Sequence, residues 1–424
     1  MNAASLRDVL EATRLTRSGR LTEATALLQR VLQGHMAPPG EHPSGKREPP
    51  TIDGVVVEPA ETVEVRRHAR LASGSGAAQQ SASRAAGGRT HAAMPEALRS
   101  FIDQATSGTF QPLSGGMVRP LPAETPVAVA DGALFLSATF MNQTGSRPYK
   151  LYIPSSYCGE PVPLIVMLHG CTQSPDDFAA GTRMNAAAEE HACLVVYPGQ
   201  TVAANSSKCW NWFSAGDQGR DRGEPSLLAG ITREVMRQYA VDPRRIYVAG
   251  LSAGGAAAAI MGSTYPDLFA AVGVHSGLAC GAAQDLPSAF AAMRQGGGGP
   301  TYRPGTASRE VRCRPVPTIV FHGDRDTTVH PLNGDSVIAH SMPETPLDRR
   351  VTEGRVSGGH AYSVTTHADA NGKVVLEQWV VHGAGHKWFG GSPAGSYTDP
   401  RGPDATREML RFFLQHENDC GQGP

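Results

Sequence analysis

The sequence lacks any excess of charge of one sign. Its 424 residues include 38 Lys and Arg against 39 Asp and Glu, which gives a formal net charge of −1. Such a balance provides no overall electrostatic attraction to nucleic acid or to an anionic membrane surface. The composition therefore favours a neutral substrate over a polyanion, and no nucleic-acid partner is expected.

Long apolar runs are missing as well. No stretch approaches the unbroken apolar length of a membrane-spanning helix. The first 20 residues also lack the apolar core and the small-residue cleavage site of a secretory signal. We therefore expect no membrane span and, by default, a cytoplasmic location, while secretion by a non-classical route stays open.

The paired C-x-x-C motifs of zinc sites are also absent. The seven cysteines all lie between residues 158 and 420, and their odd number leaves at least one thiol unpaired. We expect no structural metal from this pattern. Disulfides between some of these cysteines would fit a reducing cytoplasm poorly. The seven are Cys158, Cys171, Cys193, Cys209, Cys280, Cys313 and Cys420.

The beginning of the chain has a character of its own. Apolar residues between Leu6 and Val31 recur at spacings of three and four, which predicts two short helices forming a hairpin over residues 1–36. Residues 37–127 are rich in Pro, Gly, Ser and Ala, and this predicts a mostly disordered linker. The hairpin is interpreted either as an element that docks to a granule or a partner, or as one packed on the main domain.

Residues 128–418 show short apolar runs that alternate with helical patterns. This alternation is typical of a doubly wound, mostly parallel α/β sheet, whose sites lie at the carboxyl ends of its strands. Strands are expected near residues 133–136, 149–153, 163–168, 193–197, 245–249, 316–321 and 374–381. Helices are expected near residues 178–191, 226–239, 253–265 and 405–416.

A G-x-S-x-G motif follows one of these strands directly. It reads Gly250-Leu251-Ser252-Ala253-Gly254, and a helical pattern begins immediately after it. Strand, motif and helix in this order are what a nucleophile elbow requires, because the glycines permit a tight turn that exposes the serine hydroxyl. The motif predicts Ser252 as the nucleophile of an α/β-hydrolase fold.

A serine nucleophile needs a base, and the base needs an orienting carboxylate. Asp326 follows the expected strand near residues 316–321 and is our choice for the acid, with Asp324 as the alternative. His386 lies in a glycine-rich loop after the strand near residues 374–381 and is our choice for the base, with His382 as the alternative. Both follow the serine in the chain order of this fold.

Two backbone N–H groups are expected to stabilise the oxyanion. One belongs to Ala253, the residue after the nucleophile, and the candidate for the other is Cys171, in the loop after an early strand. Two tryptophans, Trp210 and Trp212, lie close together, and Trp388 lies beside the expected base. These rings are interpreted as substrate-binding walls of a cleft, with burial in the core as the alternative.

The motifs together resemble the polyhydroxybutyrate-depolymerase family of esterases, which includes feruloyl and acetylxylan esterases. The resemblance extends over residues 135–416 and implies the triad Ser252, Asp326 and His386, with an oxyanion hole at Cys171 and Ala253. It also implies a disulfide between Cys171 and Cys209. The residues that carry it are His169 to Gln173, Cys209 to Phe213, Gly250 to Gly255, His322 to Asp326 and Gly385 to Trp388, followed by the segment Gly390 to Tyr397.

The sequence thus predicts a serine esterase that works through an acyl-enzyme without a metal or organic cofactor. The expected substrate is a short-chain polyhydroxyalkanoate such as polyhydroxybutyrate, or its oligomers. A feruloyl or acetylxylan type of carbohydrate ester is the second expectation. A non-catalytic scaffold with a hydrolase fold is the alternative of another class.

Overall fold

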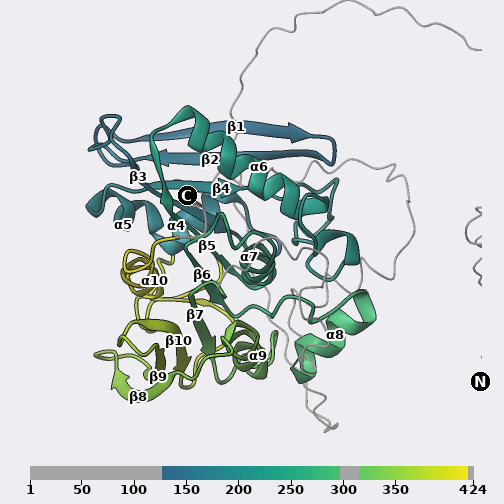
Figure 1. Ribbon diagram of the computed structural model, residues 1–424, viewed down its shortest axis with the longest axis vertical. Helices are drawn as coiled ribbons and strands as arrows, with labels where there is room; N and C mark the ends of the chain where they lie inside the picture. The colour runs from purple at the N-terminus through teal and green to yellow at the C-terminus, as the bar shows by residue number, and fades with distance from the viewer. Residues whose placement is uncertain (1–126, 297–314, 419–424) are drawn as a thin grey trace, which may run out of the picture. The chain divides into compact units, whose positions relative to one another are not determined.

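The computed structural model describes residues 127–296 and 315–418. The hairpin predicted over residues 1–36 lies outside them, as does the predicted linker over residues 37–127 apart from its last residue. The described residues form a ten-stranded sheet in the order β1-β2-β4-β3-β5-β6-β7-β10-β9-β8. Figure 1 shows helices on both sides of this sheet.

The six strands from β4 to β10 in this order run parallel, whereas β1 and β2 at one edge and β9 and β8 at the other are joined by antiparallel pairing. This arrangement is an α/β-hydrolase fold and confirms the predicted mostly parallel sheet. The strands of the large sheet are β1 (Leu134–Asn142), β2 (Gly145–Ile153), β3 (Val162–Leu168), β4 (Leu194–Pro198), β5 (Val241–Leu251), β6 (Ala271–His275), β7 (Thr318–Gly323), β8 (Asp348–Arg355), β9 (Ala361–Ala368) and β10 (Val374–Val381).

The helices cover the two faces of the sheet in two groups, with α4, α5 and α10 on one side and α6, α7 and α9 on the other (Figure 1). They are α4 (Pro175–Thr182), α5 (Met184–Glu190), α6 (Gly223–Gln238), α7 (Ala253–Thr264), α8 (Leu286–Gln295), α9 (Leu332–Ser341) and α10 (Ala405–Phe413). A 3-10 helix, η1 (Ala215–Asp217), precedes α6, and a small two-stranded sheet pairs β11 (Trp388–Phe389) with β12 (Thr398–Asp399).

The sheet separates two apolar cores because successive strand residues point to opposite faces. In β3, Leu164 and Val166 belong to the core under α6 and α7, whereas Ile165 and Met167 belong to the core under α5 and α10. All four side chains are buried. The strand is therefore apolar on both faces, which explains why its sequence reads as a continuous apolar run.

The predicted helix over residues 178–191 is wrong in one respect, since the structure contains two helices there. Arg183 separates α4 from α5 and has a left-handed backbone conformation, with φ 56° and ψ 24°. A helix cannot continue through such a residue. The break directs α4 and α5 along different paths over the same face of the sheet.

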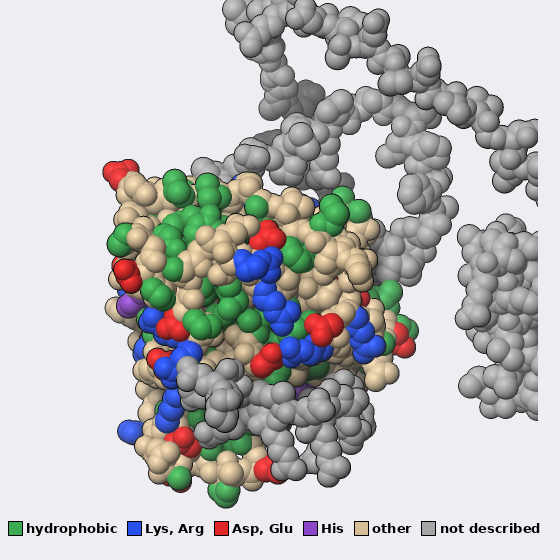
Figure 2. All heavy atoms as spheres, turned by 45° about the horizontal axis from the view of Figure 1, so that its top comes forward, with side chains coloured by type: hydrophobic (Ala, Val, Ile, Leu, Met, Phe, Trp, Pro, Cys, Tyr) green, Lys and Arg blue, Asp and Glu red, His purple; other side chains and the backbone are tan. Residues whose placement is uncertain are grey.

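Charged side chains of both signs are mixed on the surface. On the face drawn in Figure 2, basic and acidic side chains lie close together and neither sign forms a broad patch. Among the described residues, Arg220 forms an ion pair with Asp267, and Arg407 forms one with Glu190. Among the described residues, no helix is both long and apolar enough to cross a bilayer.

Candidate active site

Ser252 lies at the turn between β5 and α7, in an unusual backbone conformation with φ 58° and ψ −119°. The two glycines of the motif are required by close packing around this turn. A Cβ atom on Gly254 would lie 2.0 Å from the carbonyl oxygen of Leu168, and one on Gly250 would lie 2.3 Å from the backbone of Gly254. The motif therefore allows the start of α7 to pack directly on the end of β3.

Asp326 follows β7 and is almost completely buried. Its Oδ1 atom accepts hydrogen bonds from the backbone N–H groups of Thr328, at 2.9 Å, and Val329, at 2.8 Å. Its Oδ2 atom lies 2.7 Å from Nδ1 of His386. Because an ionised carboxylate only accepts hydrogen bonds, Nδ1 of His386 carries a proton, and its Nε2 atom is free to accept one when the ring is neutral.

The surroundings of Asp326 favour its charged form. Burial alone would raise the pKa of this carboxyl group, but the charge of His386 and hydrogen bonds from His322 and His386 outweigh burial and hold the pKa well below its usual range. Asp326 is therefore a carboxylate at neutral pH and is able to stabilise a protonated His386.

The alternatives Asp324 and His382 pair with each other. Oδ2 of Asp324 lies 3.0 Å from Nδ1 of His382, and its Oδ1 atom accepts the backbone N–H of Gly383 at 2.7 Å. The side chains of this pair are 37% and 44% exposed, whereas those of Asp326 and His386 are 0% and 12% exposed. The geometry thus favours the buried pair for chemistry, and the exposed pair braces the loop between β10 and β11.

Ser252 and His386 line one cavity at the carboxyl ends of the parallel strands. In the part of the chain that the structure describes, the hydrogen bond of the His386 side chain is made with Asp326, and none joins it to the side chain of Ser252. Such bonds are often long in ligand-free enzymes and tighten when a substrate binds. The structure therefore brings the expected nucleophile and base to the same cavity, with the carboxylate behind the base.

The two expected oxyanion donors, Cys171 and Ala253, line this cavity too. Ala253 is the first residue of α7, so its N–H group has no acceptor within the helix. In the loop after β3, the two N–H groups that follow Cys171 have other acceptors, since Thr172 donates to the carbonyl oxygen of Ser207 and Gln173 donates to that of Gly170. Both candidate donors therefore belong to the wall that Ser252 shares.

A disulfide joins Cys171 to Cys209, as the resemblance implied, with their Cα atoms 4.2 Å apart. It ties the loop after β3 to the segment that contains Trp212. Three other cysteines carry free thiols, namely Cys158, Cys193 and Cys280. The remaining two, Cys313 and Cys420, lie outside the described residues.

Only one of the three predicted tryptophans lines the cavity, and it is Trp212. Trp210 is 0% exposed and donates its Nε1–H to the carbonyl oxygen of His169 at 3.1 Å. Trp388 is 1% exposed and donates to Oγ1 of Thr406 at 3.0 Å. The predicted substrate-binding role does not fit Trp210 and Trp388, because both indoles fill the core and satisfy their N–H groups there.

Two histidines that the sequence analysis gave no role lie close to the site. Nε2 of His322 lies 3.4 Å from Oδ2 of Asp326 and 2.9 Å from the carbonyl oxygen of Val329. The carbonyl oxygen of His275 accepts the N–H of Ser252 at 2.8 Å. Burial holds the pKa of His275 well below its usual range, so its ring is neutral. The sequence could have indicated His322, because this residue directly precedes the expected acid loop. His275 could have been found only if β6, of which it is the last residue, had been predicted first.

The described residues contain no group of three or more His, Cys, Asp and Glu side chains arranged to hold a metal ion. The polar groups at the cavity include a hydroxyl, an imidazole backed by a carboxylate, and backbone N–H groups, together with the side chains of Gln173, Thr328 and Tyr397. This set is suited to nucleophilic attack on a carbonyl carbon followed by proton transfer.

The disulfide is expected to contribute to stability, because its two cysteines are 38 residues apart in the sequence. The double substitution Cys171→Ala/Cys209→Ala should lower the free energy of unfolding by about 2–4 kcal/mol. Urea unfolding followed by tryptophan fluorescence measures this change. The control Cys158→Ala, at an exposed free thiol, should leave the value unchanged, and an equal loss in both variants would contradict the assignment.

The depressed pKa of Asp326 also predicts a pH dependence. Its folded pKa is below the value of about 3.9 in an unfolded chain, so ionised Asp326 stabilises the fold above that pH. This contribution is lost as the pH falls from about 4 towards the folded pKa. The difference in unfolding free energy between wild type and Asp326→Asn should therefore shrink from pH 6 to pH 3. A difference that grows on acidification would contradict the prediction, and Asp324→Asn is the exposed control.

Part of this chain is similar to a family of known proteins. Residues 147–345 match the family described as "Esterase PHB depolymerase". The chain is 32% identical over 271 residues to poly(3-hydroxyalkanoate) depolymerase C of Paucimonas lemoignei, which covers 61% of this chain and 64% of that protein. It is 28% identical to poly(3-hydroxybutyrate) depolymerase of Ralstonia pickettii, over 56% of this chain and 49% of that protein.

A third relative is feruloyl esterase B of Neurospora crassa, which is 32% identical over 34% of this chain and 50% of its own length. The chain thus spans about half to two thirds of the length of these curated relatives. Within the chain, the matched region contains Ser252, Cys171, Ala253 and Asp326, and His386 follows it. Residues 147–345 are therefore similar to the family described as "Esterase PHB depolymerase".

Proposed function

We propose that this protein is a serine esterase that hydrolyses short-chain hydroxyalkanoate esters through an acyl-enzyme. The observation that carries the proposal is the 2.7 Å contact between Asp326 and His386, with Ser252 lining the same cavity as His386. A buried carboxylate, an imidazole and a serine in this relation form the machinery of acyl transfer.

In the proposed reaction, Nε2 of His386 takes the proton of the Ser252 hydroxyl as Oγ attacks the ester carbonyl carbon. The N–H groups of Cys171 and Ala253 donate hydrogen bonds to the oxyanion that forms. The C–O bond of the ester then breaks, and His386 gives its proton to the leaving alcohol. Asp326 stabilises the imidazolium during both transfers.

The acyl group is then bound to Ser252 as an ester. A water molecule gives a proton to His386 and attacks the acyl carbon, and the second oxyanion is held by the same two donors. When this intermediate collapses, the carboxylic acid leaves and the proton returns to Ser252. The balance closes with one water consumed and no cofactor required.

The lining of the cavity supports an apolar acyl group. Trp212, Leu278, Met293 and Val329 present apolar surface beside Ser252. A hydroxybutyrate unit buries a methyl group and a short chain, which gain from such a lining. The relatives named as hydroxyalkanoate depolymerases support the same substrate class. A feruloyl or acetylxylan type of ester remains the second expectation.

Substitutions in the triad should separate catalysis from scaffolding. Ser252→Ala should abolish turnover of p-nitrophenyl butyrate, and Asp326→Asn should lower kcat by a factor on the order of 10⁴, because His386 would lose its orienting carboxylate. The matched control Asp324→Asn should stay within a few-fold of wild type. Steady-state rates at pH 7.5 measure all three.

Two outcomes would contradict this assignment. Equal activity of wild type and Ser252→Ala would favour a non-catalytic scaffold. A larger loss in Asp324→Asn than in Asp326→Asn would reassign the acid.

The substrate class can be tested at Met293, which is partly buried and lines the cavity. Met293→Gln keeps the length of the side chain but adds a polar amide. We expect up to about a tenfold fall in kcat/KM for a 3-hydroxybutyrate trimer, because the acyl chain would lose apolar contact. Turnover of p-nitrophenyl acetate, which has a shorter acyl group, should change less. Faster hydrolysis of methyl ferulate than of the trimer by wild type would favour the carbohydrate-ester alternative.

A further inference from the structure

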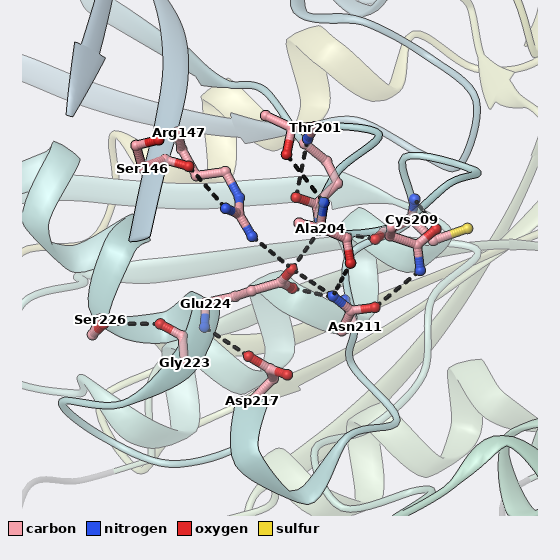
Figure 3. Close-up of polar contacts among 12 residues, drawn as sticks. Ser146, Arg147, Thr201, Ala204, Cys209, Asn211, Asp217, Gly223, Glu224 and Ser226 are labelled. Carbon is pink, nitrogen blue, oxygen red and sulfur yellow. Dashed lines mark hydrogen bonds and ion pairs between the residues drawn. The ribbon is translucent and has the colours of Figure 1, made fainter. Parts of the chain in front are cut away.

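A buried carboxylate lies beside the cavity wall in a role that the proposed reaction does not use. Glu224 is near the start of α6 and is 6% exposed. Its Oε2 atom accepts the backbone N–H of Asn211 at 2.7 Å. Its Oε1 atom accepts hydrogen bonds from Nδ2 of Asn211 at 2.9 Å and from Nη2 of Arg147 at 3.2 Å (Figure 3). The side-chain amide of Gln200 also donates to Oε1.

Every group that contacts this carboxylate is a donor. A protonated carboxyl group would need an acceptor for its own hydrogen, and these four hydrogen bonds offer none. Burial, with a smaller effect from the charge of Asp217, raises the pKa of Glu224 above its usual value, and hydrogen bonds from Asn211 and Gln200 and the charge of Arg147 offset only part of this rise. The start of a helix also favours a negative charge. The contacts therefore fit the ionised form.

The partners of Glu224 control the segment between β4 and α6. In residues 199–222 the secondary structure consists of the three-residue η1 alone, so the path of this segment depends on turns, on the disulfide and on side-chain hydrogen bonds. Gln200 donates its side-chain amide to the carbonyl oxygen of Cys209 at 2.9 Å. Asn211 accepts at Oδ1 from Asn205, which in turn accepts the N–H of Cys209 at 3.2 Å. Both backbone polar groups of Cys209 are thus held within this network.

The same network reaches the candidate oxyanion loop by two routes. Cys209 is bonded to Cys171 through the disulfide. The backbone N–H of Gln200 also donates to Nε2 of His169 at 3.0 Å, and Nδ1 of His169 donates to the carbonyl oxygen of Gly170 at 2.7 Å. Burial lowers the pKa of His169 to about 4, so its ring stays neutral and keeps this arrangement of donor and acceptor at neutral pH.

We infer that Glu224 is a positioning residue for the oxyanion donor Cys171 and the cavity wall at Trp212. Its carboxylate accepts hydrogen bonds from Gln200 and Asn211, and these residues hold the Cys209 end of the disulfide in place. Asn211 is directly bonded along the chain to Trp212, which lines the cavity. The inference rests on the proposed function, because it assigns Glu224 a role in the same acyl transfer.

The test is the isosteric substitution Glu224→Gln, which replaces one acceptor oxygen with an NH₂ group that faces donors and removes the charge opposite Arg147. Glu234→Gln is the matched control, because Glu234 is on the same helix and contacts Tyr149 instead, at 3.1 Å. Rates with p-nitrophenyl butyrate are divided by the number of active sites titrated with a fluorophosphonate. This division removes any loss caused by unfolded protein.

We expect Glu224→Gln to lower kcat per active site by at least about tenfold, with KM changed by less than about threefold, because a displaced N–H weakens binding of the oxyanion more than binding of the ester. Inhibition by a butyl trifluoromethyl ketone, which forms an oxyanion on the serine, should weaken by a similar factor. Glu234→Gln should stay within about twofold of wild type in both measurements.

A kcat per active site within twofold of wild type in folded Glu224→Gln would overturn the inference. If that variant does not fold, Asn211→Ala decides, because it removes one donor and keeps the backbone N–H. Asn211→Ala should lower kcat per active site less than expected for Glu224→Gln, and ketone binding should weaken by the same factor as kcat. Unchanged values of both would overturn the inference. Absence of Ser252-dependent hydrolysis in wild type would instead defeat the proposed function.

Discussion

The strained turn at Ser252 is the constraint on which the rest of the site depends. A non-glycine residue at φ 58° and ψ −119° costs about 1–3 kcal/mol, and the surrounding structure must hold it there. The close contact of Gly254 with the end of β3 and the hydrogen bond from Ser252 to His275 supply that support. Because the turn is fixed, the first N–H groups of α7 and the loop after β3 meet at one cavity. The other residues of the site are placed relative to this point.

Much of the fold could be predicted from the sequence because the central strands are apolar on both faces. The runs that became β3, β5, β7 and β10 are recognisable without any knowledge of their partners. The strand β6 was missed because only two of its five residues, Val272 and Val274, have large apolar side chains, although it lies in the middle of the sheet. The outer strand β8 was missed because its exposed residues are mostly polar or charged, so its formation depends on pairing with β9. The break at Arg183 is a backbone conformation that its residue type does not reveal.

For the site, chain order and glycine pattern were enough to select Ser252, Asp326 and His386 as candidates. They could not decide between Asp326 and Asp324, because both follow the same strand, and it is burial that separates the two Asp–His pairs. For the tryptophans, the sequence could not predict the role of the side chain. An aromatic residue beside a catalytic motif lines a cavity or fills the core according to packing, and only Trp212 does the former. The role inferred for Glu224 had no signal in the sequence, since its partners are separated from it by up to 77 positions.

Acyl transfer through Ser252 is tested most directly by mapping the site of covalent reaction. A fluorophosphonate probe reacts with an activated serine, and peptide mass spectrometry then locates the adduct. The account predicts one adduct, on the peptide that contains Ser252, and its disappearance when the protein is unfolded before labelling. Ser363 is the informative comparison, because its hydroxyl lies 2.8 Å from His382 in the exposed pair. An adduct on Ser363 with none on Ser252, or no adduct on the folded protein, would contradict the account.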